Sequence, residues 1–158
     1  MSLTVKISSP RRCFPQPLHF RRIYWGHGSI VYFDLDGFKA VNDRFGHRRG
    51  DKLLCAVVDR TMKNPRKTDL MARLGGGEFR LLLPEIDQDG ARSMLLKIQS
   101  ALLREMRRHN WRAAFSIGVL SYRESSATVN KLIKQADDLM YSVKNDGKNA
   151  IACSVYQS

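Results

Sequence analysis

From residue 30 onward, apolar residues recur at spacings that predict alternating strands and helices. The run over 30–34 is apolar, β-branched and aromatic, which is typical of a buried strand, whereas 90–109 repeats apolar residues at steps of three and four, which is typical of an amphipathic helix. The predicted strands span 30–34, 70–74, 78–84, 113–122 and 149–156, and the predicted helices span 38–45, 51–62, 90–109 and 127–144. This order predicts an α/β fold of the α+β type, with a mixed sheet covered by helices.

Three consecutive glycines, Gly75, Gly76 and Gly77, separate two of the predicted strands and are followed by Glu78 and Phe79. Glycine takes the positive φ values that a short β-turn demands, so the segment predicts a tight hairpin.

A second polar turn follows the first predicted strand, which ends on Asp34 and Asp36. An ionised carboxylate at the end of a buried strand is costly unless a cation or hydrogen-bond donors compensate it. The amides of Gly37 and Phe38 open the next helix and form a ready anion site. Together these groups suit a Mg²⁺–phosphate ligand such as a nucleoside triphosphate. The alternative for Asp36, which we favour, is that its side chain caps the helix.

The chain has 27 Lys and Arg against 15 Asp and Glu, a net charge of +12. Such an excess concentrates anionic partners but does not choose among nucleotides, nucleic acid and acidic lipid, and scattered basic residues also simply solvate a surface. Basic runs interleaved with aromatic residues are absent, which disfavours a nucleic-acid groove.

The sequence disfavours membrane-spanning, secreted, disulfide-rich and zinc-binding classes of protein. The longest apolar run falls short of the roughly 20 residues that span a bilayer, and a secretory signal is not recognisable, so we expect a soluble, cytoplasmic domain. Cys13, Cys55 and Cys153 are odd in number and far apart, which predicts free thiols rather than a disulfide framework or a zinc site.

Several ordered motifs in this chain resemble those of the GGDEF domains, whose active members are diguanylate cyclases that condense two GTP into cyclic di-GMP and two diphosphates. The matching segments are FDLDGFKAVNDRFGHRRGD (33–51), RKTDLMARLGGGEF (66–79), FSIGV (115–119) and ADDLMYSVKNDGKN (136–149). The resemblance implies a mainly antiparallel sheet of about five strands, similar to a polymerase palm. It also implies a GGDEF-like domain over 30–158 and a variant N-terminal segment over 1–29.

The resemblance implies a role for each matching residue. Asp34 would bind Mg²⁺ with help from the Leu35 carbonyl, while Gly37 and Phe38 would contact GTP. Other residues have both an implied role and a structural alternative. Asn42 and Asp51 would recognise guanine, or else be a mid-helix polar residue and an N-cap. Lys144 and Lys148 would grip phosphates, or else serve as charges at a helix C-terminus.

The signature motif departs from the family at Gly77, where relatives carry an Asp or Glu that binds metal near the attacking hydroxyl. Phosphoryl transfer relies on metal ions to orient the attacking oxygen and to neutralise phosphate charge, so this change predicts weak or absent cyclase activity. Glu78 is the remaining acid, but because it follows the turn we expect its side chain to point elsewhere.

A second family site is retained. Arg66 and Asp69 have the RxxD spacing at which active cyclases bind cyclic di-GMP as an inhibitor. Arginine can fork onto guanine O6 and N7, and aspartate can accept from the Watson–Crick edge. The alternative is a local salt bridge.

The leading hypothesis is therefore a degenerate GGDEF domain with a weakened Mg²⁺ site that binds cyclic di-GMP, GTP or both as a regulatory module. One alternative is an active cyclase in which Glu78 or water replaces the lost ligand. Another is a basic interaction or nucleic-acid-binding domain that keeps only the fold. The resemblance also implies pairing of two copies and neighbouring domains in a longer signalling protein.

Overall fold

The computed structural model describes residues 26–63, 66, 69–123 and 127–157. Within these residues five strands form one sheet in the order β2-β3-β1-β4-β5. Neighbouring strands are antiparallel except β4 and β5, which are parallel. The elements are β1 (Gly28–Asp36), α1 (Phe38–Phe45), α2 (His47–Thr61), β2 (Leu70–Gly75), β3 (Glu78–Pro84), α3 (Gln88–Arg108), β4 (Ala114–Tyr122), α4 (Val129–Asn145) and β5 (Ile151–Val155). The predicted α+β fold with a mixed, mainly antiparallel sheet is confirmed.

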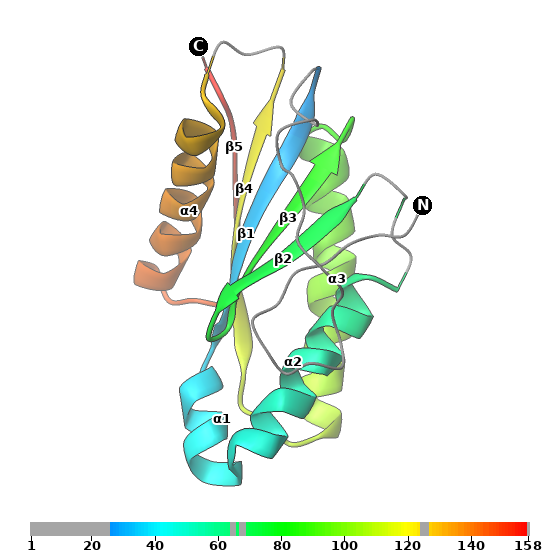
Figure 1. Ribbon diagram of the computed structural model, residues 1–158, viewed down its shortest axis with the longest axis vertical. Helices are drawn as coiled ribbons and strands as arrows, with labels where there is room; N and C mark the ends of the chain where they lie inside the picture. The colour runs from blue at the N-terminus through cyan, green and yellow to red at the C-terminus, as the bar shows by residue number, and fades with distance from the viewer. Residues whose placement is uncertain (1–25, 64–65, 67–68, 124–126, 158) are drawn as a thin grey trace.

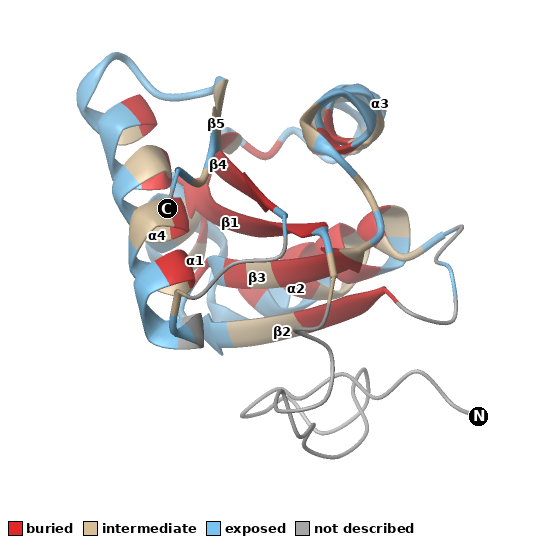
Figure 2. Ribbon diagram, turned by 90° about the horizontal axis from the view of Figure 1, so that it is seen from above, coloured by how far each residue is buried: buried red, intermediate tan, exposed pale blue. Residues whose placement is uncertain are grey.

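Strand β1 is the middle of the sheet, and helices cover both of its faces (Figure 1). Val31, Phe33 and Leu35 join the core beneath α2 and α3, whereas Ile30 and Tyr32 join the smaller core beneath α4. Successive side chains on a strand point to opposite faces, so a strand buried on both sides reads as one continuous apolar run. Figure 2 shows this burial along β1, β3 and β4 between the two helical layers.

The predicted elements all occur, with shifted ends. The largest shift is in α2, which begins at His47 rather than at residue 51. Its first turn is polar and exposed, so apolar periodicity could not reveal it. Gly46, with φ 85°, separates α1 from α2. A helix long and apolar enough to cross a bilayer does not occur in the described part of the chain.

The cysteine prediction is partly wrong. Cys153 on β5 is a free thiol, and burial raises its pKa. Cys55 is disulfide-bonded, and Cys13 lies outside the described residues. Separation along the chain carries no information about distance in space, which is why the sequence pattern missed the bond.

Candidate functional site

The end of β1 carries two buried carboxylates, those of Asp34 and Asp36. Asp34 forms an ion pair with the Nζ of Lys144 in the last turn of α4. The Asp36 carboxylate accepts a hydrogen bond of 2.7 Å from the hydroxyl of Ser116 on β4. The predicted cap is therefore wrong, because Asp36 still belongs to β1 and Gly37, with φ 86°, takes the N-cap position of α1 without any side-chain hydrogen bond.

The glycine segment forms the predicted turn and lies beside the end of β1. Gly75 and Gly76 have positive φ angles of 154° and 50°, which glycine adopts at little cost. Gly77 is buried, and its carbonyl accepts a hydrogen bond of 2.9 Å from the amide of Leu35. A β-carbon added at Gly77 would lie 2.7 Å from the Leu35 Cβ and 3.4 Å from the Asp34 Oδ1. A side chain at position 77 would therefore point toward the end of β1, beside Asp34.

The aromatic residue of the signature motif anchors this turn in the core. The ring of Phe79 stacks on the ring of Phe33 with a centroid distance of 5.0 Å, and Phe115 meets Phe33 edge to face at 6.5 Å. All three rings are almost completely buried. Such aromatic pairs contribute about 0.5–1.5 kcal/mol each beyond their buried area, so the turn has a fixed position relative to β1.

Glu78 lies opposite Asp34 in the antiparallel register of β1 and β3. Directly opposed residues project from the same face of a sheet, so the register brings Glu78 to the face that carries Asp34. Its side chain is exposed, whereas that of Asp34 is buried. The register of the two strands decides this placement, and the turn residues alone do not reveal it.

The two lysines proposed to bind phosphate meet at the end of α4. Burial lowers the pKa of Lys144, and the positive charge of Lys148 lowers it further. Lys148 is exposed and has a positive φ of 65° just after the helix. Lys144 therefore contacts the Asp34 carboxylate and has a second positive charge, that of Lys148, nearby.

The two residues proposed to recognise guanine lie on consecutive helices, Asn42 on α1 and Asp51 on α2. The Asn42 side chain lies against Gly50, where an added β-carbon would be 1.7 Å from the Asn42 Oδ1. This oxygen is buried and accepts no hydrogen bond within the described structure. Asp51, the next residue after Gly50, is exposed within α2, so the alternative that it is an N-cap is wrong.

Arg73 on β2 lies between the glycine turn and α2, and the sequence did not predict it as a site residue. Its Nε donates to the carbonyl of Gly76 at 2.9 Å. Burial lowers the pKa of Arg73, and the nearby charge of Asp51 raises it. Arg73 thus links the turn to α2. The signal in the sequence was a lone arginine in an apolar strand just before the glycines.

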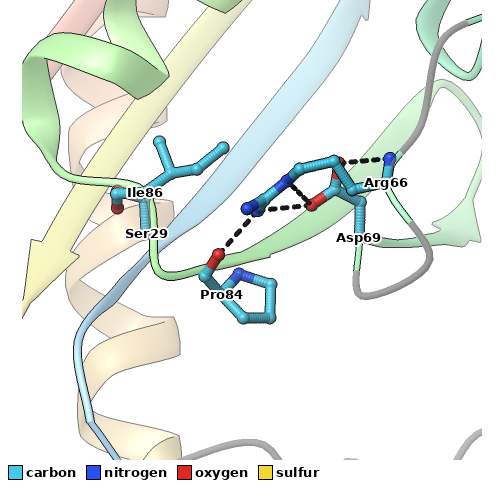
Figure 3. Close-up of polar contacts among 5 residues, drawn as sticks. All are labelled: Ser29, Arg66, Asp69, Pro84 and Ile86. Carbon is cyan, nitrogen blue, oxygen red and sulfur yellow. Dashed lines mark hydrogen bonds and ion pairs between the residues drawn. The ribbon is translucent and has the colours of Figure 1, made fainter.

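Arg66 and Asp69 form a compact pair just before the start of β2 (Figure 3). The glycine turn lies at the other end of this strand. The guanidinium donates to the Asp69 carboxylate through Nε at 3.1 Å and Nη2 at 2.7 Å, and Nη2 also donates to the Pro84 carbonyl at 2.6 Å. The Asp69 side chain is 7% exposed and that of Arg66 is 42% exposed. The local salt bridge is therefore present, and it holds a partly exposed arginine in place.

The residues at the end of β1 are a poor fit to the divalent metal that the sequence implies. Mg²⁺ prefers near-octahedral oxygen geometry and is usually held by one or two carboxylates together with substrate phosphates and water. Position 77 offers no side-chain oxygen, and Asp34 already contacts an ammonium group. The described residues contain no group of three or more His, Cys, Asp or Glu side chains that could hold a metal ion.

Comparison with known proteins identifies the family. The chain matches the family model described as "Diguanylate cyclase, GGDEF domain" over residues 20–150. It is 39% identical over 123 residues to the bifunctional diguanylate cyclase/cyclic di-GMP phosphodiesterase MucR of Pseudomonas aeruginosa, covering 77% of this chain and 18% of MucR. It is 38% identical over 123 residues to the diguanylate cyclase DgcM of Escherichia coli, covering 78% of this chain and 30% of DgcM. The chain thus spans less than a third of the length of these two relatives.

Solved structures agree with this assignment. The active GGEEF domain of a diguanylate cyclase from Vibrio cholerae superposes with a TM-score of 0.71 and 25% identity, over 84% of this chain and 85% of that chain. A microbial GGDEF domain studied for its interaction with cyclic di-GMP superposes with a TM-score of 0.69 and 27% identity, over 82% of this chain and 80% of that chain. The chain therefore belongs to the GGDEF family of diguanylate cyclase domains.

Proposed function

We propose that this chain is a GGDEF domain of cyclic di-GMP signalling that has little or no diguanylate cyclase activity and acts by binding nucleotide. The observation that carries the proposal is Gly77, which has no carboxylate and has the Leu35 side chain packed against it. A metal ion that activates the attacking hydroxyl would lack a ligand there, and phosphoryl transfer depends strongly on such positioning. Binding makes weaker demands on geometry than catalysis does.

The proposed ligand of the Arg66–Asp69 pair is cyclic di-GMP. Asp69 is buried and fixes the guanidinium of Arg66, and a pre-positioned arginine loses less entropy when it binds the O6 and N7 edge of guanine. The relative of known structure that was studied with cyclic di-GMP supports this choice by similarity. GTP is the proposed ligand of the altered site, where Asn42, Asp51, Lys144 and Lys148 remain.

A second candidate is an active cyclase, and one observation favours it. Glu78 shares a sheet face with Asp34, so an acid is available near the vacant position. Its exposure and the ion pair between Asp34 and Lys144 weigh against this candidate.

Calorimetric titration with cyclic di-GMP tests the binding proposal. We expect heat at micromolar ligand for the unmodified protein and for Arg104→Ala, which removes an exposed arginine of α3. Arg66→Ala should lose binding by about 10- to 100-fold, since hydrogen bonds from a charged donor contribute that much to affinity. A matching loss in both variants would refute a specific site. If the unmodified protein binds DNA in a salt-dependent manner and gives no heat with cyclic di-GMP, the domain is instead a basic interaction module.

The neighbouring parts of the protein belong to the same proposal. MucR and DgcM extend far beyond the region that this chain matches. We infer that this domain works as a segment of a longer signalling protein, with residues 1–29 as its variant N-terminal segment, in which two copies pair.

A further inference from the structure

The counter-ion of Asp34 is a lysine. The Asp34 side chain is 10% exposed and lies in contact with the Nζ of Lys144, whose side chain is 30% exposed. A carboxylate buried to this degree is stable in its ionised form only when a positive charge or several donors compensate it. Lys144 reaches it from the last turn of α4. The compensating charge is therefore supplied by the chain itself.

The surroundings of this ion pair disfavour a divalent cation. A side chain at position 77 would collide with the Leu35 Cβ, and Glu78 is the only other acid that the strand register brings beside Asp34 among the described residues. The positive charge of Lys148 lies near Lys144. These two ammonium groups balance the carboxylates of Asp34 and Glu78, so the four side chains together have no net negative charge to attract Mg²⁺.

We propose that Lys144 is the resident cation of this site, so that a guanine nucleoside triphosphate binds beside Asp34 without a divalent metal. This inference rests on the proposed function, in which the altered site binds GTP. An ammonium group has three donors. One donor serves Asp34, and the others remain for phosphate oxygens. Lys148 provides the second cation of the phosphate subsite.

Calorimetric titration of the whole chain with GTP, in EDTA and again in Mg²⁺, tests this inference. We expect the same dissociation constant under both conditions. Lys144→Met should weaken binding in EDTA about 10- to 100-fold, and Mg²⁺ should then restore part of the affinity because Asp34 is left uncompensated. Lys134→Met is the matched control, since Lys134 lies on the exposed surface of α4 and pairs with Asp138. It should bind GTP as the unmodified protein does.

Binding of GTP that requires Mg²⁺ in the unmodified protein would overturn the inference, and so would the absence of GTP binding under both conditions. These measurements need no variant, so they decide the question even if Lys144→Met does not fold. The same samples titrated with cyclic di-GMP separate this inference from the wider proposal. Heat with cyclic di-GMP but not with GTP would support a cyclic di-GMP receptor and refute the metal-independent GTP site. GTP binding in EDTA without heat from cyclic di-GMP would support the metal-independent GTP site and refute a cyclic di-GMP receptor.

Discussion

Gly77 and Leu35 are packed so closely that a β-carbon on Gly77 would lie 2.7 Å from the β-carbon of Leu35. The same two residues are joined by a backbone hydrogen bond of 2.9 Å. The glycine turn therefore packs directly against the end of β1, and position 77 is part of the packed interior.

Gly77→Ala should lower the free energy of unfolding by about 1–3 kcal/mol, because an added methyl group in a filled site forces its neighbours to move. Urea denaturation measures the change. Gly90→Ala is the control, since its β-carbon would meet only side-chain atoms of Asp87 and Ile86 at 3.2 Å, and we expect a change below about 1 kcal/mol. Equal effects of the two substitutions would contradict the close packing at Gly77.

Ser116→Ala should destabilise the fold by about 1–3 kcal/mol, because it removes a hydrogen-bond donor from the buried carboxylate of Asp36. The other oxygen of this carboxylate, Oδ1, already lacks a hydrogen-bond partner. Ser121→Ala should cost less. Its partner Ser29 keeps a hydrogen bond of 2.7 Å to the Ile86 carbonyl. Chemical denaturation of both variants checks the order, and a larger loss for Ser121→Ala would contradict it.

Gly118→Ala should be more damaging than Gly77→Ala. A β-carbon at Gly118 would lie 2.4 Å from the amide nitrogen of Met140 and 2.5 Å from the carbonyl oxygen of Ala136. Both are backbone atoms of α4, so no side-chain rotation relieves the contact and the helix must move away from β4. We expect a loss at or above the upper end of the range of about 1–3 kcal/mol for overpacking. A lower urea midpoint than that of Gly77→Ala is the predicted result.

Glu105 should make the stability depend on acidic pH. Partial burial raises its pKa, but hydrogen bonds from His109 and Arg60 and the charges of Arg60 and Arg108 outweigh burial and hold the pKa below its ordinary value of 4.5. A carboxyl group with a depressed pKa in the folded state stabilises the fold above its unfolded pKa. This contribution is lost as the pH falls through the folded value.

Glu105→Gln tests this dependence. At pH 7 the variant should be about 1–2 kcal/mol less stable than the unmodified protein, because the bonds to charged donors are weakened. The difference should shrink as the pH falls below 4.5, where the carboxyl group of the unmodified protein takes up a proton. Thermal melts across this range give the comparison, and a gap that stays constant with pH would exclude the assigned role.

The sequence predicted the order and type of the elements because their apolar periodicity reflects the two cores on either side of β1. It predicted less well the features that depend on strand register or on distant segments. Glu78 shares a sheet face with Asp34 through pairing between strands. Asp36 bonds to Ser116 across 80 residues of chain. Neither relationship has a local signal, whereas the glycine turn does.

The sequence predicted which residues gather at the candidate site better than it predicted the contacts between them. Family resemblance selected Asp34, Lys144 and Lys148, and the fold brings them together. It did not reveal that the lysine and the aspartate form a pair, because such a contact depends on how the last turn of α4 meets β1. Arg73 was missed for the same reason, since its contacts involve the turn and a distant helix.

We propose that glycine at position 77 leaves this domain with little cyclase activity. The direct measurement is chromatography of the cyclic di-GMP formed from GTP and Mg²⁺ by the unmodified protein and by Gly77→Asp, with Gly77→Asn as the control of similar size. We predict little or no product from the unmodified protein and from Gly77→Asn, and a clear gain for Gly77→Asp once the turn moves away from Leu35. Robust turnover by the unmodified protein that Gly77→Asp leaves unchanged would contradict the account.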